Sequence, residues 1–259
     1  MTELVLLERE GDIARVVLNR PDRLNAFNLD MWRRLGAVMA EVEAEAGLRC
    51  LVVSGGTSKA FGAGADIAEF PQERFSAAQA EAYAGVMAPA LESLEACAVP
   101  TVAAVQGACV GAGLELALLC DLKIAGAGAR FGIPIKRIGH CLPYAAMRPL
   151  VALVGQTTAM EILLEGRILD AEEAQAKGLV NRVVPDEAVE TEAMATARRI
   201  AEGAPLAARG HKRFVRRAAD PRPLSEAEWR EPFQSCDSAD YHEGVRAFLD
   251  KRKPAFEGQ

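Results

Sequence analysis

The chain has 259 residues, a formal net charge of −6 and 50% hydrophobic residues. This length and hydrophobic fraction predict one large α/β domain, or one domain with an appendage. The negative charge argues against general nucleic-acid binding, although a local basic pocket could still hold a phosphorylated small molecule. No apolar run has the length of a membrane span, and the first residues predict a hairpin rather than a signal peptide. Six cysteines without metal-ligand spacing predict reduced core thiols in a cytoplasmic protein with no metal site.

Strands and helices are predicted to alternate along the first part of the chain. Residues 4–10 and 13–18 alternate in polarity and predict two strands that turn at Gly11-Asp12. Asn28 is expected to cap a helix over residues 29–46. A buried strand is predicted next over residues 50–54, followed by a glycine-rich loop over 55–65 and a short helical piece over 66–70. An alanine-rich helix over 77–96 and a buried strand over 101–105 follow. Because the gaps between strands leave room for crossover helices, a mostly parallel α/β fold is expected.

Helices are predicted to dominate the last part of the chain. Residues 131–143 predict an irregular loop or a short strand. Two helices are expected next, over residues 144–153 and 157–164. Asp170 is expected to cap a helix over residues 171–177, which ends at Gly178 and leads to a strand over residues 180–184. From residue 186 onward only helices are predicted, and they carry most of the basic clusters.

The most informative stretch is TVAAVQGACVGAGLELALLCDLKIA, residues 101–125. It predicts a buried strand, a small-residue turn at 108–113, an apolar helix over 114–120 and a second buried strand. Glu115 lies one turn into that helix, which otherwise offers nothing polar to water. A buried carboxylate is costly unless it is paired, hydrogen-bonded or has a raised pKa. Two interpretations stay open: an acid satisfied by N–H groups at the helix start, or the acid/base of a site.

A second glycine-rich stretch, AFGAGADI, covers residues 60–67. Its glycines could merely serve a turn, with Asp66 as a helix N-cap. Alternatively, the stretch presents the backbone N–H of Ala65 where a helix begins. Two small-residue turns, each following a buried strand, could aim two N–H groups at one point and form an oxyanion hole. Glycine and alanine suit that site because a ligand must approach the main chain closely.

The remaining polar residues give weaker signals. The three histidines show no ligand spacing, and each is expected to be structural or exposed; they are His140, His211 and His242. His140 and Tyr144 gain interest only from the loop in which they lie. The basic residues at 251–253 predict a solvated tail, or a contact with a phosphate.

Five motifs occur in order over nearly the whole chain: RLNAF (23–27), AFGAGADI, QGACVGAGLELALLCDLKIA, GRILDAEEAQAKGLVNRVVP (166–185) and FLDKRKPAF (248–256). Together they resemble the crotonase family, also called the enoyl-CoA hydratase/isomerase family. The resemblance implies an α/β fold, a spiral of ββα units, over residues 1–200. It also implies a helical C-terminal region, residues 201–259, that drives homotrimers, commonly paired into hexamers.

The resemblance also implies the substrate and the residues that bind it. The substrate would be an acyl-CoA thioester, with no other cofactor. An enolate-like intermediate would be held by the N–H groups of Ala65 and Ala112, and Glu115 falls on the first catalytic glutamate of the hydratases. Coenzyme A would be contacted by Arg23, Leu24 and Ala26, by Ala63, Asp66 and Ile67 along the pantetheine, and by Lys253 and Phe256, often from a neighbouring subunit.

The sequence departs from that family at Ile135, where the hydratases carry a second glutamate. Water addition to a conjugated thioester needs a base for water and an acid for the α-carbon, work that two carboxylates share. Isoleucine can do neither, and it makes the pocket drier, which should raise the pKa of Glu115. Three functions stay open: a hydratase in which His140 or Tyr144 replaces the acid, another enolate reaction (isomerisation, decarboxylation or thioester hydrolysis), or a non-catalytic acyl-CoA binder.

Overall fold

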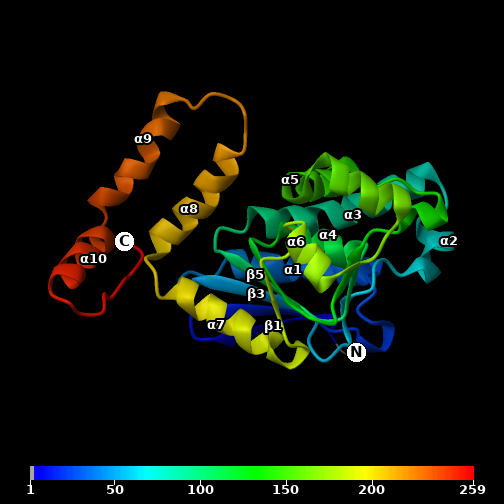
Figure 1. Cartoon of the computed structure of the whole chain (residues 1–259), viewed down its shortest axis with the longest axis horizontal. Helices are drawn as coiled ribbons and strands as arrows, with labels where there is room; N and C mark the ends of the chain where they lie inside the picture. The colour runs from blue at the N-terminus through cyan, green and yellow to red at the C-terminus, as the bar shows by residue number, and fades with distance from the viewer. Residues whose placement is uncertain (1–2) are drawn as a thin grey trace.

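The computed structural model describes residues 3–259, in which two β-sheets form the centre (Figure 1). The larger sheet contains, in spatial order, β1 (Val5–Glu10), β2 (Ile13–Leu18), β3 (Cys50–Ser54), β5 (Thr101–Val105), β7 (Leu122–Gly126) and β10 (Arg182–Val184). Its β1 and β2 are antiparallel and the other neighbours are parallel. The smaller sheet contains β4 (Ala60–Gly62), β6 (Ala108–Val110), β8 (Arg130–Gly132) and β9 (Leu169–Asp170). The predicted hairpin and the mostly parallel arrangement are confirmed.

The chain repeats one structural unit. In each unit the first strand lies in the large sheet, the second lies in the small sheet, and helical structure follows. The units are β3 and β4 with α2 (Phe70–Glu73) and α3 (Ala77–Ala96), β5 and β6 with α4 (Ala112–Leu119), and β7 and β8 with α5 (Tyr144–Met160). The expected spiral of ββα units is therefore confirmed.

Two of the strands lie where no strand was predicted. The predicted glycine-rich loop contains β4, and the predicted small-residue turn contains β6. Each strand has only three residues, AFG in β4 and ACV in β6, which is too short to show an alternation that a sequence pattern could detect. The two strands pair in parallel, with Ala60 opposite Ala108. This pairing places the two glycine-rich segments side by side.

The helix starts follow the predicted caps. The side chain of Asn28 accepts a hydrogen bond of 2.9 Å from the Met31 N–H at the start of α1 (Leu29–Glu43), which is three residues shorter than predicted. Asp170 caps α6 (Ala171–Ala176) in the same way. The two helices predicted over 144–153 and 157–164 are confirmed: the backbone of α5 is non-helical at Gly155, and a π-helical turn, Glu161–Glu165, follows its end at Met160. A helix, α7 (Val189–Ala201), contacts β3, β5 and β7.

Asn25 ties the polar loop after β2 to the glycine-rich segment. Its side chain is buried and donates to the carbonyl oxygens of Gly55 at 2.9 Å and Ala60 at 3.1 Å. Its side-chain oxygen accepts from the Arg20 N–H at 2.8 Å. All of these partners are main-chain groups, so this one side chain fixes the path of two loops.

Replacing Asn25 by alanine is expected to lower the free energy of unfolding by about 2–4 kcal/mol, because buried backbone groups lose their partners. The comparison is Asn19→Ala, which removes one partly exposed hydrogen bond to the Glu3 carbonyl and should cost less than about 1 kcal/mol. Urea unfolding of the three proteins measures both values. Equal stability of the two variants would contradict the role given to Asn25.

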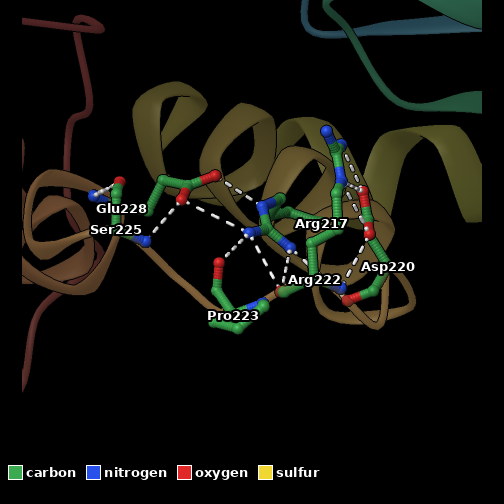
Figure 2. A network of polar contacts seen from close by, with 6 residues as sticks. All are labelled: Arg217, Asp220, Arg222, Pro223, Ser225 and Glu228. Carbon is green, nitrogen blue, oxygen red and sulfur yellow. Dashed lines mark hydrogen bonds and ion pairs between the residues drawn. The ribbon is translucent and has the colours of Figure 1, made fainter.

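The C-terminal helices project from the core as an arm (Figure 1). They are α8 (Pro205–Ala218), α9 (Glu226–Gln234) and α10 (Ala239–Leu249). The turn between α8 and α9 is held by the guanidinium of Arg217, which donates to the Glu228 carboxylate and to three carbonyl groups (Figure 2). The arm exposes large apolar side chains: Trp229, Phe233, Tyr241, Val245, Phe248 and Leu249. The division of the chain at residue 200 stays a prediction. In residues 3–259 no helix is both long and apolar enough to cross a membrane.

Candidate active site

The two glycine-rich segments contact each other main chain to main chain. A Cβ atom added to Gly113 would lie 2.8 Å from the carbonyl carbon of Gly62 and overlap its oxygen, and one added to Gly62 would lie 2.9 Å from the Gly113 Cα. Further along, Gly64 and Gly111 adopt φ angles of +107° and +51°, which favour glycine. Glycine is therefore needed here for close approach and for backbone conformation.

Each segment ends in a residue that lines the same cavity, Ala65 in one and Ala112 in the other. The neighbours of Ala65 on both sides pair with Phe27, whose N–H donates to the Gly64 oxygen and whose oxygen accepts from the Asp66 N–H. Among the described residues no acceptor pairs with the Ala65 N–H. Ala112 is the first residue of α4, so its N–H lies in the unpaired first turn of the helix. The structure thus brings the two predicted oxyanion donors to one cavity.

The cavity has a volume of about 220 Å³ and mostly apolar walls. Trp32, Met87, Ile133, Ile135 and Ile138 contribute apolar surface, and Ala65, Ala112 and Glu115 line the same space. A wall of this kind holds an acyl chain and excludes water, which strengthens every electrostatic interaction inside.

Glu115 is buried in this cavity without a partner. Glu115 is 8% exposed, and its side chain makes no hydrogen bond or ion pair with any residue from 3 to 259. Burial raises the pKa of the Glu115 carboxyl to about 7, and the nearby Arg74 guanidinium acts in the opposite direction. The interpretation in which local N–H groups satisfy this acid is therefore wrong. An unpaired acid with a pKa near neutrality can both accept and donate a proton at physiological pH.

The raised pKa of Glu115 predicts a pH-dependent effect on stability. Its pKa is about 7 in the folded protein, against an ordinary value of 4.5, so between these values the folded state binds more protons. The free energy of unfolding therefore falls as pH rises through this range. Glu115→Gln removes this titration. The free energy of unfolding of the variant minus that of the wild type should therefore rise by roughly 2–3 kcal/mol between pH 5 and pH 8. Urea unfolding of both proteins at pH 5 and pH 8 tests this expectation. The same difference in stability between variant and wild type at both pH values would contradict it.

The position of the missing second carboxylate is apolar. Ile135 begins a short helical turn, Ile135–Ile138, and lines the cavity. His140 lines it too, and its Nε2 lies 3.2 Å from the Arg74 guanidinium, which can only donate. Burial and the Arg74 charge both lower the pKa of His140. Tyr144 is 84% exposed and is not part of the cavity wall. Of the two candidates for the lost acid, only His140 is in place, and it is held neutral.

Several residues of the cavity wall were missed by the sequence analysis, among them Arg74 and Tyr83. The guanidinium of Arg74 lies over the rings of Phe70 and Tyr83, with distances of 4.5 and 4.8 Å to the ring centres. Burial raises the pKa of Tyr83 to about 12, so its hydroxyl stays neutral. Tyr83 and Met87 are one turn apart on α3, a spacing that marks an inward face. Arg74 carries no comparable signal, because it follows the four-residue helix α2, whose position no pattern predicts.

The residues implied for coenzyme A fall into three groups. Ala63 and Ile67 line the cavity, while Asp66 caps the next helical turn and pairs with Arg20 at 2.7 Å, as expected of an N-cap. The segment of Arg23, Leu24 and Ala26 lies outside the cavity wall but adjoins it, since the Leu24 oxygen accepts from the Ala63 N–H. Lys253 and Phe256 lie at the arm: Lys253 pairs with Glu202, and Phe256 contacts Gly244. A single chain does not bring these last two to the cavity.

Comparison with known proteins shows the family of the chain. The family model described as Enoyl-CoA hydratase/isomerase matches residues 8–259. The chain belongs to this family. A probable enoyl-CoA hydratase of Mycobacterium bovis is 37% identical over 257 residues, which cover 98% of each protein. Another, from Rhizobium meliloti, is 36% identical over 259 residues, again with 98% of each protein covered.

Solved structures of the enoyl-CoA hydratase/isomerase family share the fold over the full chain. The crystal structure of an enoyl-CoA hydratase/carnithine racemase from Magnetospirillum magneticum is 48% identical and superimposes with a TM-score of 0.97. The match covers 100% of this chain and 97% of that one. The fold expected from the sequence motifs is therefore the fold of the family.

Proposed function

We propose that the protein is an enoyl-CoA hydratase-type lyase, which adds water across the double bond of a 2-enoyl-CoA thioester. The observation that supports the proposal is the unpaired Glu115 carboxyl in a cavity that Ala65 and Ala112 also line. Relatives that match nearly the whole chain are named as enoyl-CoA hydratases, which supports the same reaction. The substrate would be the CoA thioester itself, with no further cofactor.

In this mechanism the thioester oxygen accepts hydrogen bonds from Ala65 and Ala112. Negative charge grows on this oxygen as water attacks the β-carbon, and two fixed N–H donors stabilise that charge. The Glu115 carboxylate takes a proton from the attacking water as the oxygen–carbon bond forms. The resulting carboxylic acid then returns that proton to the α-carbon of the enolate. One group can serve both steps because its pKa of about 7 is close to the working pH.

Ile135→Glu tests whether the missing carboxylate limits hydration. The new carboxyl would enter the apolar wall of the cavity and supply the separate acid, so the hydration rate should rise, with an upper bound of about 10² to 10⁴-fold for a well-placed acid. The loss of the conjugated absorbance of crotonyl-CoA measures the rate. Ile135→Gln, of similar shape but without a titrating proton, is the matched control. A folded Ile135→Glu protein with no gain over Ile135→Gln would contradict the interpretation of Ile135.

A second reaction, double-bond isomerisation, is favoured by one specific observation. Ile135 leaves Glu115 as the one carboxyl in the described wall of the cavity, and a single acid/base can carry a proton from C2 to C4 of a 3-enoyl-CoA. Conversion of 3-hexenoyl-CoA to the 2-enoyl isomer, followed by absorbance, distinguishes the two reactions. Rapid isomerisation without hydration of any 2-enoyl-CoA would replace hydratase by isomerase in this proposal.

The arm supports a proposal on assembly. Its exposed apolar side chains, defined above for α9 and α10, make it a surface that another copy of the chain can cover. We infer a homotrimer, or a dimer of trimers, in which Lys253 and Phe256 reach the CoA of a neighbouring subunit, and we place the protein in the cytoplasm. Mass measurement by light scattering tests the assembly, and a monomer at micromolar concentration would contradict it.

A further inference from the structure

The cavity wall carries a cation that no described carboxylate neutralises. Arg74 is partly buried directly after α2, and its guanidinium carbon lies over the rings of Phe70 and Tyr83. Its one side-chain hydrogen bond goes to His140 Nε2. No Asp or Glu among residues 3–259 forms an ion pair with it. A guanidinium has five N–H donors, so most of its hydrogen-bonding capacity is available to a ligand.

This cation lines the cavity of the proposed acyl site. Arg74 and His140 line both the cavity of Glu115 and a second cavity of about 400 Å³. The pair therefore borders both spaces. Arg137, which is exposed and also has no carboxylate partner among the described residues, lines the first cavity as well. The wall of this cavity therefore carries two guanidinium groups and one carboxyl group.

We propose that Arg74 binds a carboxylate at the distal end of the acyl group, so that the substrate is a CoA monothioester of a dicarboxylic acid. Arginine pairs with carboxylates in a bidentate geometry, and the contacts of Arg74 with two rings restrict where that pair would form. A partly buried charge without a protein partner is costly in the free protein, and the substrate anion relieves that cost on binding. The inference rests on the proposed binding of acyl-CoA in this cavity.

Binding of unreactive thioesters tests the inference without requiring catalysis. Calorimetry compares succinyl-, glutaryl- and adipyl-CoA with butyryl-, pentanoyl- and hexanoyl-CoA, pairs of equal chain length that differ in the terminal carboxylate. For at least one length the wild type should bind the carboxylated ester tenfold or more tightly. Arg74→Gln should abolish this preference and change the Kd of the neutral ester less than threefold. Arg148→Gln, which removes an exposed charge of the same kind on α5, should keep the preference.

The other outcomes separate the two proposals. Binding of both esters without preference at any length, or a preference that survives Arg74→Gln, would overturn the role of Arg74 and leave the proposed function intact. Equal weakening of both esters by Arg74→Gln would also overturn it, and would make Arg74 a positioning residue for the cavity. Absence of binding by all six esters would overturn the acyl-CoA site itself.

Discussion

Glu115→Gln is expected to lower the turnover of a 2-enoyl-CoA by about 10² to 10⁴-fold, the usual contribution of one general acid/base. Glutamine keeps the size of the side chain and its place in the first turn of α4, but it cannot take the proton from water or deliver it to the α-carbon. The loss should appear in kcat. The Kd of a saturated acyl-CoA should stay within a few-fold of the wild-type value, because the two N–H donors and the apolar walls are unchanged.

The matched control for this change is Glu81→Gln, an exposed glutamate on α3 that makes no ion pair among the described residues. It should retain full activity. The account of Glu115 fails if Glu115→Gln keeps more than about a tenth of the wild-type rate, since the factor typical of a catalytic acid/base would then be missing. Together with the stability experiment at two pH values, a stable but inactive Glu115→Gln protein would show that Glu115 serves catalysis and not stability.

Gly113→Ala is expected to have the second large effect. The added methyl group would overlap the Gly62 oxygen, a main-chain atom that cannot rotate away as a flexible side chain could. The two glycine-rich segments must separate, which moves the Ala112 N–H relative to the Ala65 N–H. Losing one aligned oxyanion donor costs about 10² to 10³-fold in kcat. Overpacking should also lower the free energy of unfolding by about 1–3 kcal/mol.

Gly85→Ala provides the comparison, because a Cβ atom at this exposed position in α3 meets nothing within 4 Å. It should keep the activity and raise the stability by about 0.5–1 kcal/mol, the gain expected in a helix interior. If Gly113→Ala does not fold, Gly62→Ala makes a milder clash with the Gly113 Cα, at 2.9 Å, and should show the same loss in kcat. Wild-type turnover by either folded variant would contradict the paired-donor geometry.

The sequence predicted those parts of the fold that local interactions determine. The caps at Asn28 and Asp170 were correct because a side-chain oxygen at a helix start satisfies free N–H groups whatever surrounds it. The strands β4 and β6 were missed because a segment of three residues forms a strand only when a partner lies beside it. The ββα spiral was expected from family motifs, since the pairing of segments more than forty residues apart leaves no trace in periodicity.

The candidate site also contains residues that the sequence predicted and residues that it did not. Glu115 stood out because a carboxylate in an apolar helix is unusual in any fold. The sequence could not predict whether Glu115 has a hydrogen-bond or ion-pair partner, because that depends on every element around the cavity. Tyr144 looked equivalent to His140 in sequence, but the start of α5 turns its side chain to solvent. Arg74 was missed because its contacts with Tyr83 and His140 depend on how α2, α3 and the loop before α5 come together.

A crystal structure of Glu115→Gln with crotonyl-CoA tests the central claim most directly, because the variant should bind the thioester without consuming it. The account predicts that the thioester oxygen lies within hydrogen-bond distance, about 2.7–3.1 Å, of both the Ala65 and the Ala112 nitrogen atoms. The side chain at position 115 should face the α- and β-carbons. A thioester oxygen that contacts neither N–H, or an acyl chain that lies outside the cavity of Glu115, would contradict the account.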